Sequence, residues 1–322
     1  MVDKRNSGGL EAEAPQYEAP RAKRRGSVRA NVLTPYLFMV PYLILFVVFV
    51  LIPAFFGIWM SLHQWDYFAP VKEWVGLDNF AELFTPGTIT YELFWKSMAA
   101  TGKFTLYSVP LLVVIPLIVA LILNQKFRGQ SFFRAMYFAP YVLGVAVIGI
   151  LWRFLLDRNV GYVNYYLGQL GLPDSIAWTS ALPWVWISLV GVTVWWTLGF
   201  NAVIYLAGLQ DIDPALYDAA KVDGANRWQR FWHVTLPGLR PVLLFVITIT
   251  ILASANMFGQ SYLLTDGGPG EATQTAVMYI AEEGLRNFRM GSAAAMSYVL
   301  AFFLVVISIL NFVFLRERSI EE

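Results

Sequence analysis

Six long runs of apolar residues alternate with shorter polar segments along the chain. Each run is long enough for a helix to cross a bilayer, which takes roughly 20 residues. The pattern predicts an all-α integral membrane protein with six transmembrane helices, because only helices and closed barrels satisfy the backbone in lipid. The predicted spans are 36–62, 104–123, 135–156, 182–209, 241–264 and 293–315.

Composition supports the membrane assignment and sets the N-terminus apart. The 322 residues are 57% hydrophobic and 14% charged, whereas charged residues make up about 25% of a typical soluble domain. Residues 1–30 are rich in Glu, Ala, Pro, Gly and Arg, and we expect a disordered cytoplasmic tail before a membrane domain at 31–322. The net charge of +1 gives no general attraction to nucleic acid, and the absence of cysteine excludes disulfides and thiolate metal sites.

The distribution of Lys and Arg predicts the orientation in the membrane. Six spans put both termini on one side. Basic residues gather in the N-terminal tail, in the loops 124–134 and 210–240, and at the C-terminus, whereas the alternate loops hold few. By the positive-inside rule, both termini and the 210–240 loop are cytoplasmic. The basic run at 21–29 either sets this topology or binds a partner or anionic lipid.

The 210–240 loop begins with the signals of a short helix. Asp213 suits the N-cap position and Pro214 suits the first helical position. The helix is expected to run to about Lys221, before Asp223-Gly224 supplies a turn.

A second helix is expected in the same loop. Asn226 and Gln229 have the spacing of a capping box, and apolar residues follow at helical spacing until Pro237-Gly238. The loop therefore predicts a structured helix-turn-helix between two membrane spans, with a surface for something other than lipid.

This loop resembles the EAA loop of ABC-importer permeases, which has a Glu-Ala-Ala triplet, a following Gly and a later Leu-Pro pair. The first position here is Asp218, where the family usually has Glu, so its carboxylate reaches one methylene less far. The resemblance implies a coupling helix that docks into a groove on a separate cytoplasmic ATPase. The expected coupling residues are Asp218, Ala219, Ala220, Asp223, Gly224, Ala225, Leu236 and Pro237.

Four of these residues have specific expected roles under that resemblance. Gly224 gives backbone freedom, Ala219 permits close approach, Asp218 makes a charged contact, and Leu236 anchors the second helix.

The resemblance to carbohydrate-type permeases extends from about residue 35 to 315. It is carried by Val75-Gly76-Leu77-Asp78-Asn79-Phe80, by a stretch from Ala120 to Asn164, and by the segment from Leu264 to Ile280 with its Asp266-Gly267-Gly268-Pro269-Gly270 turn. The outer loop at 63–96 is too short for the large inserted domain of the maltose-type first subunit. Simpler sugar and glycerol-phosphate permeases are therefore the nearer comparison.

The resemblance implies a transport subunit rather than an enzyme. It would form a heterodimer with a second permease and work with two ATPase subunits and an extracytoplasmic solute-binding protein, in the lipid bilayer of a bacterial or archaeal cell membrane. ATP and Mg would bind to the ATPase partner, because this chain has no phosphate-binding loop motif. No cofactor is expected on this chain.

Polar side chains within the predicted spans are candidates for a substrate pathway. Such groups are costly in lipid unless they are used. Interhelical hydrogen bonding is the alternative for the amides and tyrosine, and packing is the alternative for the tryptophan. The candidates are Asn201, Tyr205, Asn256, Gln260 and Trp196.

A second function class rests on two carboxylates. Asp211 and Asp213 form a D-x-D pair, as in metal-dependent sugar transferases, and could hold a divalent ion. The capping role expected of Asp213 opposes this interpretation. His63 and His233 are expected on opposite faces of the membrane, so neither a catalytic residue nor a metal ligand is predicted for the transport function.

Overall fold

The computed structural model describes residues 33–317, and the predicted disordered tail at 1–30 lies outside the described residues. The described chain is almost entirely helical, with one two-stranded antiparallel sheet that pairs His63 with Trp74. Its elements are α1 (Leu33–Phe46), η1 (Val47–Leu51), α2 (Ile52–Ser61), β1 (His63–Gln64), β2 (Glu73–Trp74), α3 (Asp78–Glu82), α4 (Ile89–Leu123), α5 (Gln130–Val142), α6 (Val145–Leu155), α7 (Tyr162–Gln169), α8 (Trp184–Asp211), α9 (Pro214–Val222), α10 (Arg227–Arg230), η2 (Phe231–Thr235), α11 (Leu236–Gly238), α12 (Arg240–Ala255), η3 (Ser261–Thr265), α13 (Ala276–Ala281), η4 (Glu282–Arg286) and α14 (Met290–Glu317), where η marks a π-helical turn.

The chain divides into two units, Met1–Pro53 and Ala54–Glu322. In the first unit, α1 and η1 are apolar all round, and nearly all their described side chains are exposed. A helix with no polar face suits a lipid environment. The π-helical turn ends at Leu51, two residues before Pro53, whose ring cannot continue a regular α-helical hydrogen-bond ladder.

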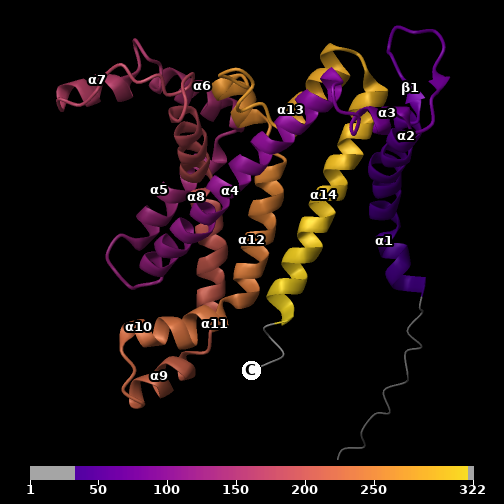
Figure 1. The fold of residues 1–322 in the computed structure, drawn as a ribbon. Helices are drawn as coiled ribbons and strands as arrows, with labels where there is room; N and C mark the ends of the chain where they lie inside the picture. Colours follow the sequence, from indigo (N-terminus) through magenta and orange to yellow (C-terminus); the bar gives the residue numbers. More distant parts are fainter. Residues whose placement is uncertain (1–32, 318–322) are drawn as a thin grey trace, which may run out of the picture. The chain divides into compact units, whose positions relative to one another are not determined.

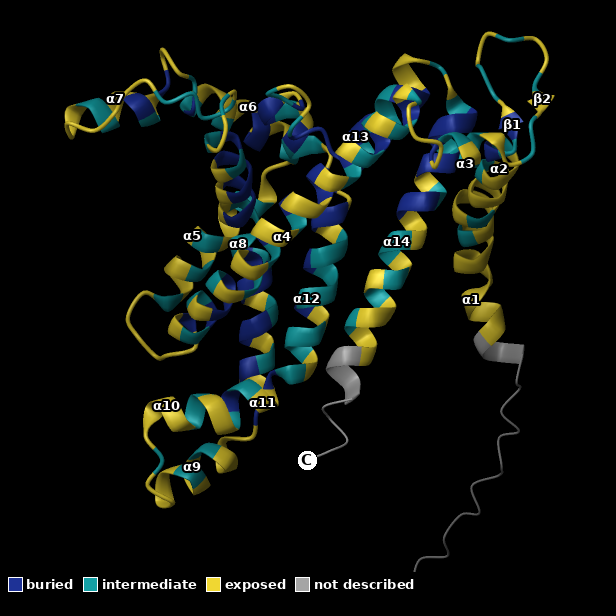
Figure 2. Ribbon diagram, in the orientation of Figure 1, coloured by how far each residue is buried: buried dark blue, intermediate teal, exposed yellow. Residues whose placement is uncertain are grey.

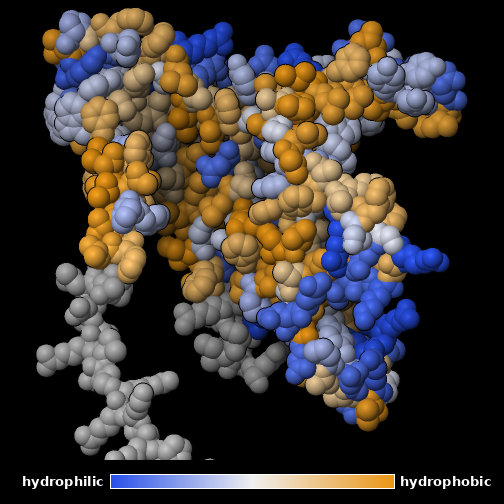
Figure 3. Space-filling model, turned by 180° about the vertical axis from the view of Figure 1, so that it is seen from behind, coloured by the Kyte–Doolittle hydropathy of each residue, from blue (hydrophilic) through white to orange (hydrophobic). Residues whose placement is uncertain are grey.

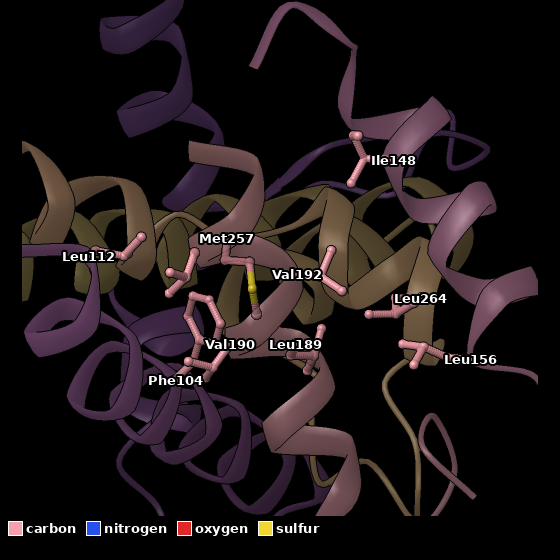
Figure 4. Packing of buried hydrophobic residues seen from close by; sticks show 10 residues of the cluster. Phe104, Leu112, Ile148, Leu156, Leu189, Val190, Val192, Met257 and Leu264 are labelled. Atoms are coloured by element: carbon pink, nitrogen blue, oxygen red, sulfur yellow. The ribbon is translucent and has the colours of Figure 1, made fainter. Parts of the chain in front are cut away.

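In the second unit, α4, α8 and α12 pack together and form its centre (Figure 1). Two apolar clusters lie along α8. One includes Phe104, Leu189 and Met257, whose side chains group together in Figure 4. The other includes Tyr205 and Leu239, nearer the helices α9 and α10.

The third predicted span is not one helix, which corrects the prediction for 135–156. The structure has α5 and α6 instead, bent by 96° at a break. Leu143 and Gly144 are extended, with ψ of 132° and 152°. Pro140 also removes a backbone N–H just before the break, which weakens the helical ladder there.

The fifth predicted span, 241–264, is also broken. Helix α12 ends at Ala255, and helical structure resumes at Gly259 and runs through η3 to Thr265. The two broken spans meet, because a Cβ on Gly259 would lie 2.8 Å from a methyl of Val145. No side chain larger than glycine's fits between the segments without movement, so the two breaks pack directly on each other.

The second span is longer than predicted. Helix α4 begins at Ile89 rather than near 104, with the Thr88 hydroxyl accepting a bond from the Tyr91 N–H at 3.1 Å. Its early turns are polar, but Thr90 and Thr101 are buried against other elements. Hydropathy alone therefore missed them.

Four described helices are long and apolar enough to cross a membrane: Tyr36–Ser61, Ile89–Leu123, Trp184–Asp211 and Met290–Val313. Two bent pairs raise the number to as many as six. Figure 3 shows hydrophobic residues over much of the second unit and a hydrophilic patch at the end that carries α9 and α10. This distribution fits helices that are surrounded by lipid.

Candidate functional site

The first candidate site is the elbow, defined as residues 210–240, which joins α8 to α12 (Figure 1). The predicted start of its first helix is confirmed. Asp213 caps α9, its carboxylate accepting a bond from the Ala215 N–H at 2.8 Å, and Pro214 is the first helical residue. The helix ends at Val222, one residue beyond the prediction.

The predicted turn after α9 is also confirmed. Gly224 has φ +78°, a conformation that glycine adopts at little cost. The Ala225 N–H donates to the Ala220 carbonyl at 2.9 Å, and the Gly224 N–H donates to the Lys221 carbonyl at 3.1 Å. These two bonds form a Schellman motif, which satisfies carbonyls at the helix end.

The second helix of the elbow begins with the predicted capping box. The Gln229 N–H donates to Asn226 Oδ1 at 2.9 Å, and the Asn226 N–H donates to Gln229 Oε1 at 2.8 Å. The helix ends at Gly238, and α12 then leaves at 68°. Both ends of α9 and the start of α10 are thus fixed by local bonds.

The two elbow helices are attached to each other and to the helices that they join. The Tyr217 hydroxyl lies 3.0 Å from Thr235 Oγ1. Ile212 and Leu239, at the two ends of the elbow, are buried in one cluster with Leu209 of α8 and Val246 of α12. Leu236, the predicted anchor, is only partly buried. Leu239 is the anchor that sequence reasoning missed.

Helix α9 presents an exposed face (Figure 2). Ala219 is exposed on it, and Val222 is 87% exposed, which is unusual for a β-branched apolar side chain. Asp218 is exposed and forms an ion pair with Lys221 at 2.6 Å. Behind this face, a hollow of about 350 Å³ lies between the two helices, lined by Ala220, Asp223, Gly224, Ala225, Gln229, Arg230, His233 and Val234.

Most of the predicted coupling residues are therefore together at the surface of the elbow. Pro237 is exposed at its far end, beside the partly buried Leu236. The described residues contain no group of three or more His, Cys, Asp or Glu that could hold a metal ion. One carboxylate oxygen of Asp213 accepts the hydrogen bond of the helix cap. Asp211 is the last residue of α8 and is exposed.

The second candidate site is a cavity of about 520 Å³ between α5, α8 and α12, next to both helix breaks. Four of the five predicted pathway residues line it: Trp196 and Asn201 from α8, and Asn256 and Gln260 from the break after α12. Its lining also includes Phe104, Leu112, Tyr141, Val145, Thr193, Thr197, Phe200, Phe245, Ile249, Thr250, Ala253, Ser254, Met257, Phe258 and Gly259.

Two of these residues also hold the helices together. Asn201 Nδ2 donates to the Leu112 carbonyl at 3.1 Å. Pro116, four residues later, has no N–H to offer that carbonyl. Trp196 Nε1 donates to the Leu143 carbonyl at the α5–α6 break at 3.0 Å. Interhelical bonding, the alternative named for the amides, is thus present for Asn201, although both residues still face the cavity.

Tyr205 does not line the cavity. It is fully buried in the cluster nearer the elbow, and its hydroxyl has no hydrogen-bond partner among the described residues. The missed lining residues on α8 had a signal in the sequence. Thr193, Thr197 and Asn201 recur every fourth residue and form a polar stripe on an otherwise apolar helix.

Comparison with known proteins identifies the family. Residues 94–319 match the family described as the binding-protein-dependent transport system inner membrane component. The trehalose/maltose transport system permease protein MalF of Thermococcus litoralis is 33% identical over 273 residues, covering 84% of this chain and 89% of that protein. The sn-glycerol-3-phosphate transport system permease protein UgpA of Agrobacterium fabrum is 31% identical over 291 residues, which cover 89% of this chain and 96% of that protein.

A solved structure has the same fold. It is a bacterial ABC transporter involved in the import of the acidic polysaccharide alginate, with a TM-score of 0.75, 24% sequence identity, and coverage of 88% of this chain and 95% of that one. The resemblance to carbohydrate-type permeases is confirmed by these matches. The chain is a multi-pass membrane protein and belongs to the family of binding-protein-dependent transport system inner membrane components, the permease subunits of ABC transporters.

Proposed function

We propose that this chain is one of two transmembrane subunits of an ATP-driven importer for a carbohydrate, and that the elbow couples it to a separate ATPase. One observation carries the proposal. The elbow exposes the small and apolar face of α9 and is continuous with α8 and α12, the two helices that supply most of the cavity wall. A force on α9 therefore acts directly on the walls of the cavity.

The packing supports transmission of that force. Ile212 and Leu239 fix both ends of the elbow in one apolar cluster with α8 and α12, and the Schellman motif and capping box stiffen its turns. Packed interfaces of this kind move as units rather than deform continuously. Closure of the ATPases would shift the elbow, and the cavity would open alternately to the two sides of the membrane.

The orientation and partners follow from the same proposal. The elbow and both termini face the cytoplasm, and the chain resides in the cell membrane. A second permease forms the heterodimer, two ATPase subunits bind ATP and Mg, and an extracytoplasmic solute-binding protein delivers the substrate. The family's binding-protein dependence supports the last partner.

The metal-dependent transferase is not favoured. Its Asp213 is engaged as a helix cap, and among the described residues no third carboxylate or histidine joins the pair. A divalent ion needs more oxygen ligands than two exposed carboxylates provide.

The substitution Gly224→Asp tests the coupling role. It should abolish ATP-driven uptake while the protein remains in the membrane, because a Cβ at φ +78° strains the turn and a carboxylate enters the docking face. The matched control is Gly87→Asp, since Gly87 also has a positive φ, +89°, and open space around it but lies in another loop. Normal uptake by Gly224→Asp, or equal loss in both variants, would refute the coupling role.

A further inference from the structure

We infer that the cavity between α5, α8 and α12 admits an electrically neutral sugar and excludes sugar phosphates and uronic acids. The inference rests on the proposed function and narrows its substrate class. Family membership alone leaves this open, because relatives named for trehalose or maltose and for glycerol-3-phosphate match to similar degrees. The charge of the residues that line the cavity is therefore the evidence on whether the substrate is neutral or charged.

No Asp, Glu, Lys, Arg or His is among the described residues that line the cavity. An ionised group that leaves water for such a site loses its hydration and gains no opposite charge. A phosphate or carboxylate would therefore be strongly disfavoured, and so would an ammonium group. Lys103 precedes the lining residue Phe104, but its side chain is exposed and is not part of the lining.

Several hydrogen-bond donors of the wall are already engaged. The amide of Asn201 and the indole of Trp196 donate to backbone carbonyls, and Asn256 Nδ2 donates to the Leu252 carbonyl at 2.8 Å. The hydroxyls of Thr193 and Thr197 donate to carbonyls of α8 itself. The donors that stay free, such as the second N–H of each asparagine, are neutral, and an anion is bound best by charged donors.

The remaining groups suit a neutral polyol. The Gln260 side chain lines the cavity and has no hydrogen-bond partner among the described residues, so its amide can both donate and accept. The oxygens of Thr193 and Thr197 remain available as acceptors for sugar hydroxyls. Each sugar hydroxyl can donate to one such oxygen without carrying a charge into the membrane.

Aromatic rings supply the other side of the recognition. The rings of Tyr141 and Phe200 are stacked, with their centroids 4.6 Å apart and an interplanar angle of 17°. The ring centroid of Trp196 lies 6.3 Å from that of Tyr141. The C–H face of a pyranose ring packs well against such rings, since their faces carry negative partial charge. A volume of about 520 Å³ lies within the range of about 300 to 1,000 Å³ found for ligand sites.

The direct test uses cells that contain the complete importer, compared with cells that lack this chain. Both are given a mixture of neutral mono- and disaccharides, sugar phosphates and uronic acid oligosaccharides, and the solutes that accumulate are identified by mass spectrometry. We expect the solute that depends on this chain to be neutral. A chain-dependent phosphate or uronate would overturn the inference but leave the importer intact. No chain-dependent accumulation would instead contradict the proposed function.

Two matched variants test the cavity itself. Phe200→Ala should raise the KM for the neutral sugar at least about tenfold, whereas Phe200→Tyr keeps the ring and should stay within about threefold. Lys103→Gln should leave uptake within about twofold, because its charge is outside the lining. Equal effects of the two Phe200 variants, or loss of uptake with Lys103→Gln, would contradict the inference.

Discussion

At the scale of single residues, polar side chains complete the backbone where proline interrupts a helix. Pro116 leaves the Leu112 carbonyl without its helical donor, and the Asn201 amide supplies one from α8. In lipid no water replaces a missing donor, so such a bond matters more to local geometry than its modest free energy suggests. Asn201 therefore positions α4 against α8 beside the cavity.

A double-mutant cycle tests this pairing. Asn201→Leu should lower the stability of the purified protein by about 0.5 to 2 kcal/mol, because it leaves the Leu112 carbonyl unpaired. In a Pro116→Ala background the same change should cost less, since the new N–H at 116 can bond that carbonyl. Thermal unfolding in detergent measures both. Identical costs in the two backgrounds would show that the bond does not compensate for the proline.

Residue patterns predicted the elbow well but the cavity only in part. The caps at Asp213 and Asn226 involve residues two or three positions apart, so the sequence contains all the information. The cavity combines α8 with two helix breaks that are distant in sequence. Asn201, Asn256 and Gln260 stood out as polar groups in apolar runs, whereas Tyr141 and Phe200 did not, because aromatic residues are common in such runs.

At the scale of elements, the helix breaks are set by tertiary contacts. Hydropathy placed apolar runs at 135–156 and 241–264 but could not show that each is interrupted. At the break after α5, the Leu143 carbonyl accepts a hydrogen bond from the Trp196 indole. At the break after α12, Gly259 packs against Val145. Neither partner is close in sequence, so a local pattern cannot predict either break.

An ion-pair network joins elements at the end of the second unit opposite the elbow. Arg289, just before α14, pairs with Glu82 of α3 at 3.0 Å and with Glu283 of η4 at 2.8 Å. Glu283 is only 3% exposed. Burial, followed by the nearby Glu283 carboxylate, raises the pKa of Tyr279 to about 12. The network thus depends on Arg289 to balance Glu283.

Arg289→Met should therefore destabilise the protein by about 1 to 3 kcal/mol, because it leaves a buried carboxylate without its cation. The matched control is Arg286→Met, whose side chain is 81% exposed in an i,i+4 pair with Glu282 and should cost less than about 0.5 kcal/mol. Adding Glu283→Gln to Arg289→Met should recover part of the loss. Thermal unfolding of the four proteins is the measurement, and equal losses in the two arginine variants would argue against the network.

At the scale of the whole molecule, coupling depends on the elbow facing the ATPase. The elbow is continuous with α8 and α12, the cavity lies between these helices, and none of the residues that the structure describes covers Val222 on the exposed face of α9. Family membership supplies the transport role. The location of the elbow, between α8 and α12, is what would couple transport to ATP hydrolysis by the ATPase.

Cysteine cross-linking tests this claim most directly, since the 322 residues contain no cysteine that would give background. Val222→Cys and Leu170→Cys introduce single thiols at positions that are 87% and 75% exposed, in the elbow and in the segment after α7. In intact cells a membrane-impermeant maleimide should label only Leu170→Cys. In isolated membranes a maleimide that carries a photoreactive group, which needs no thiol on the partner, should link only Val222→Cys to the ATPase. External labelling of Val222→Cys, or no ATPase adduct at that position, would contradict the account.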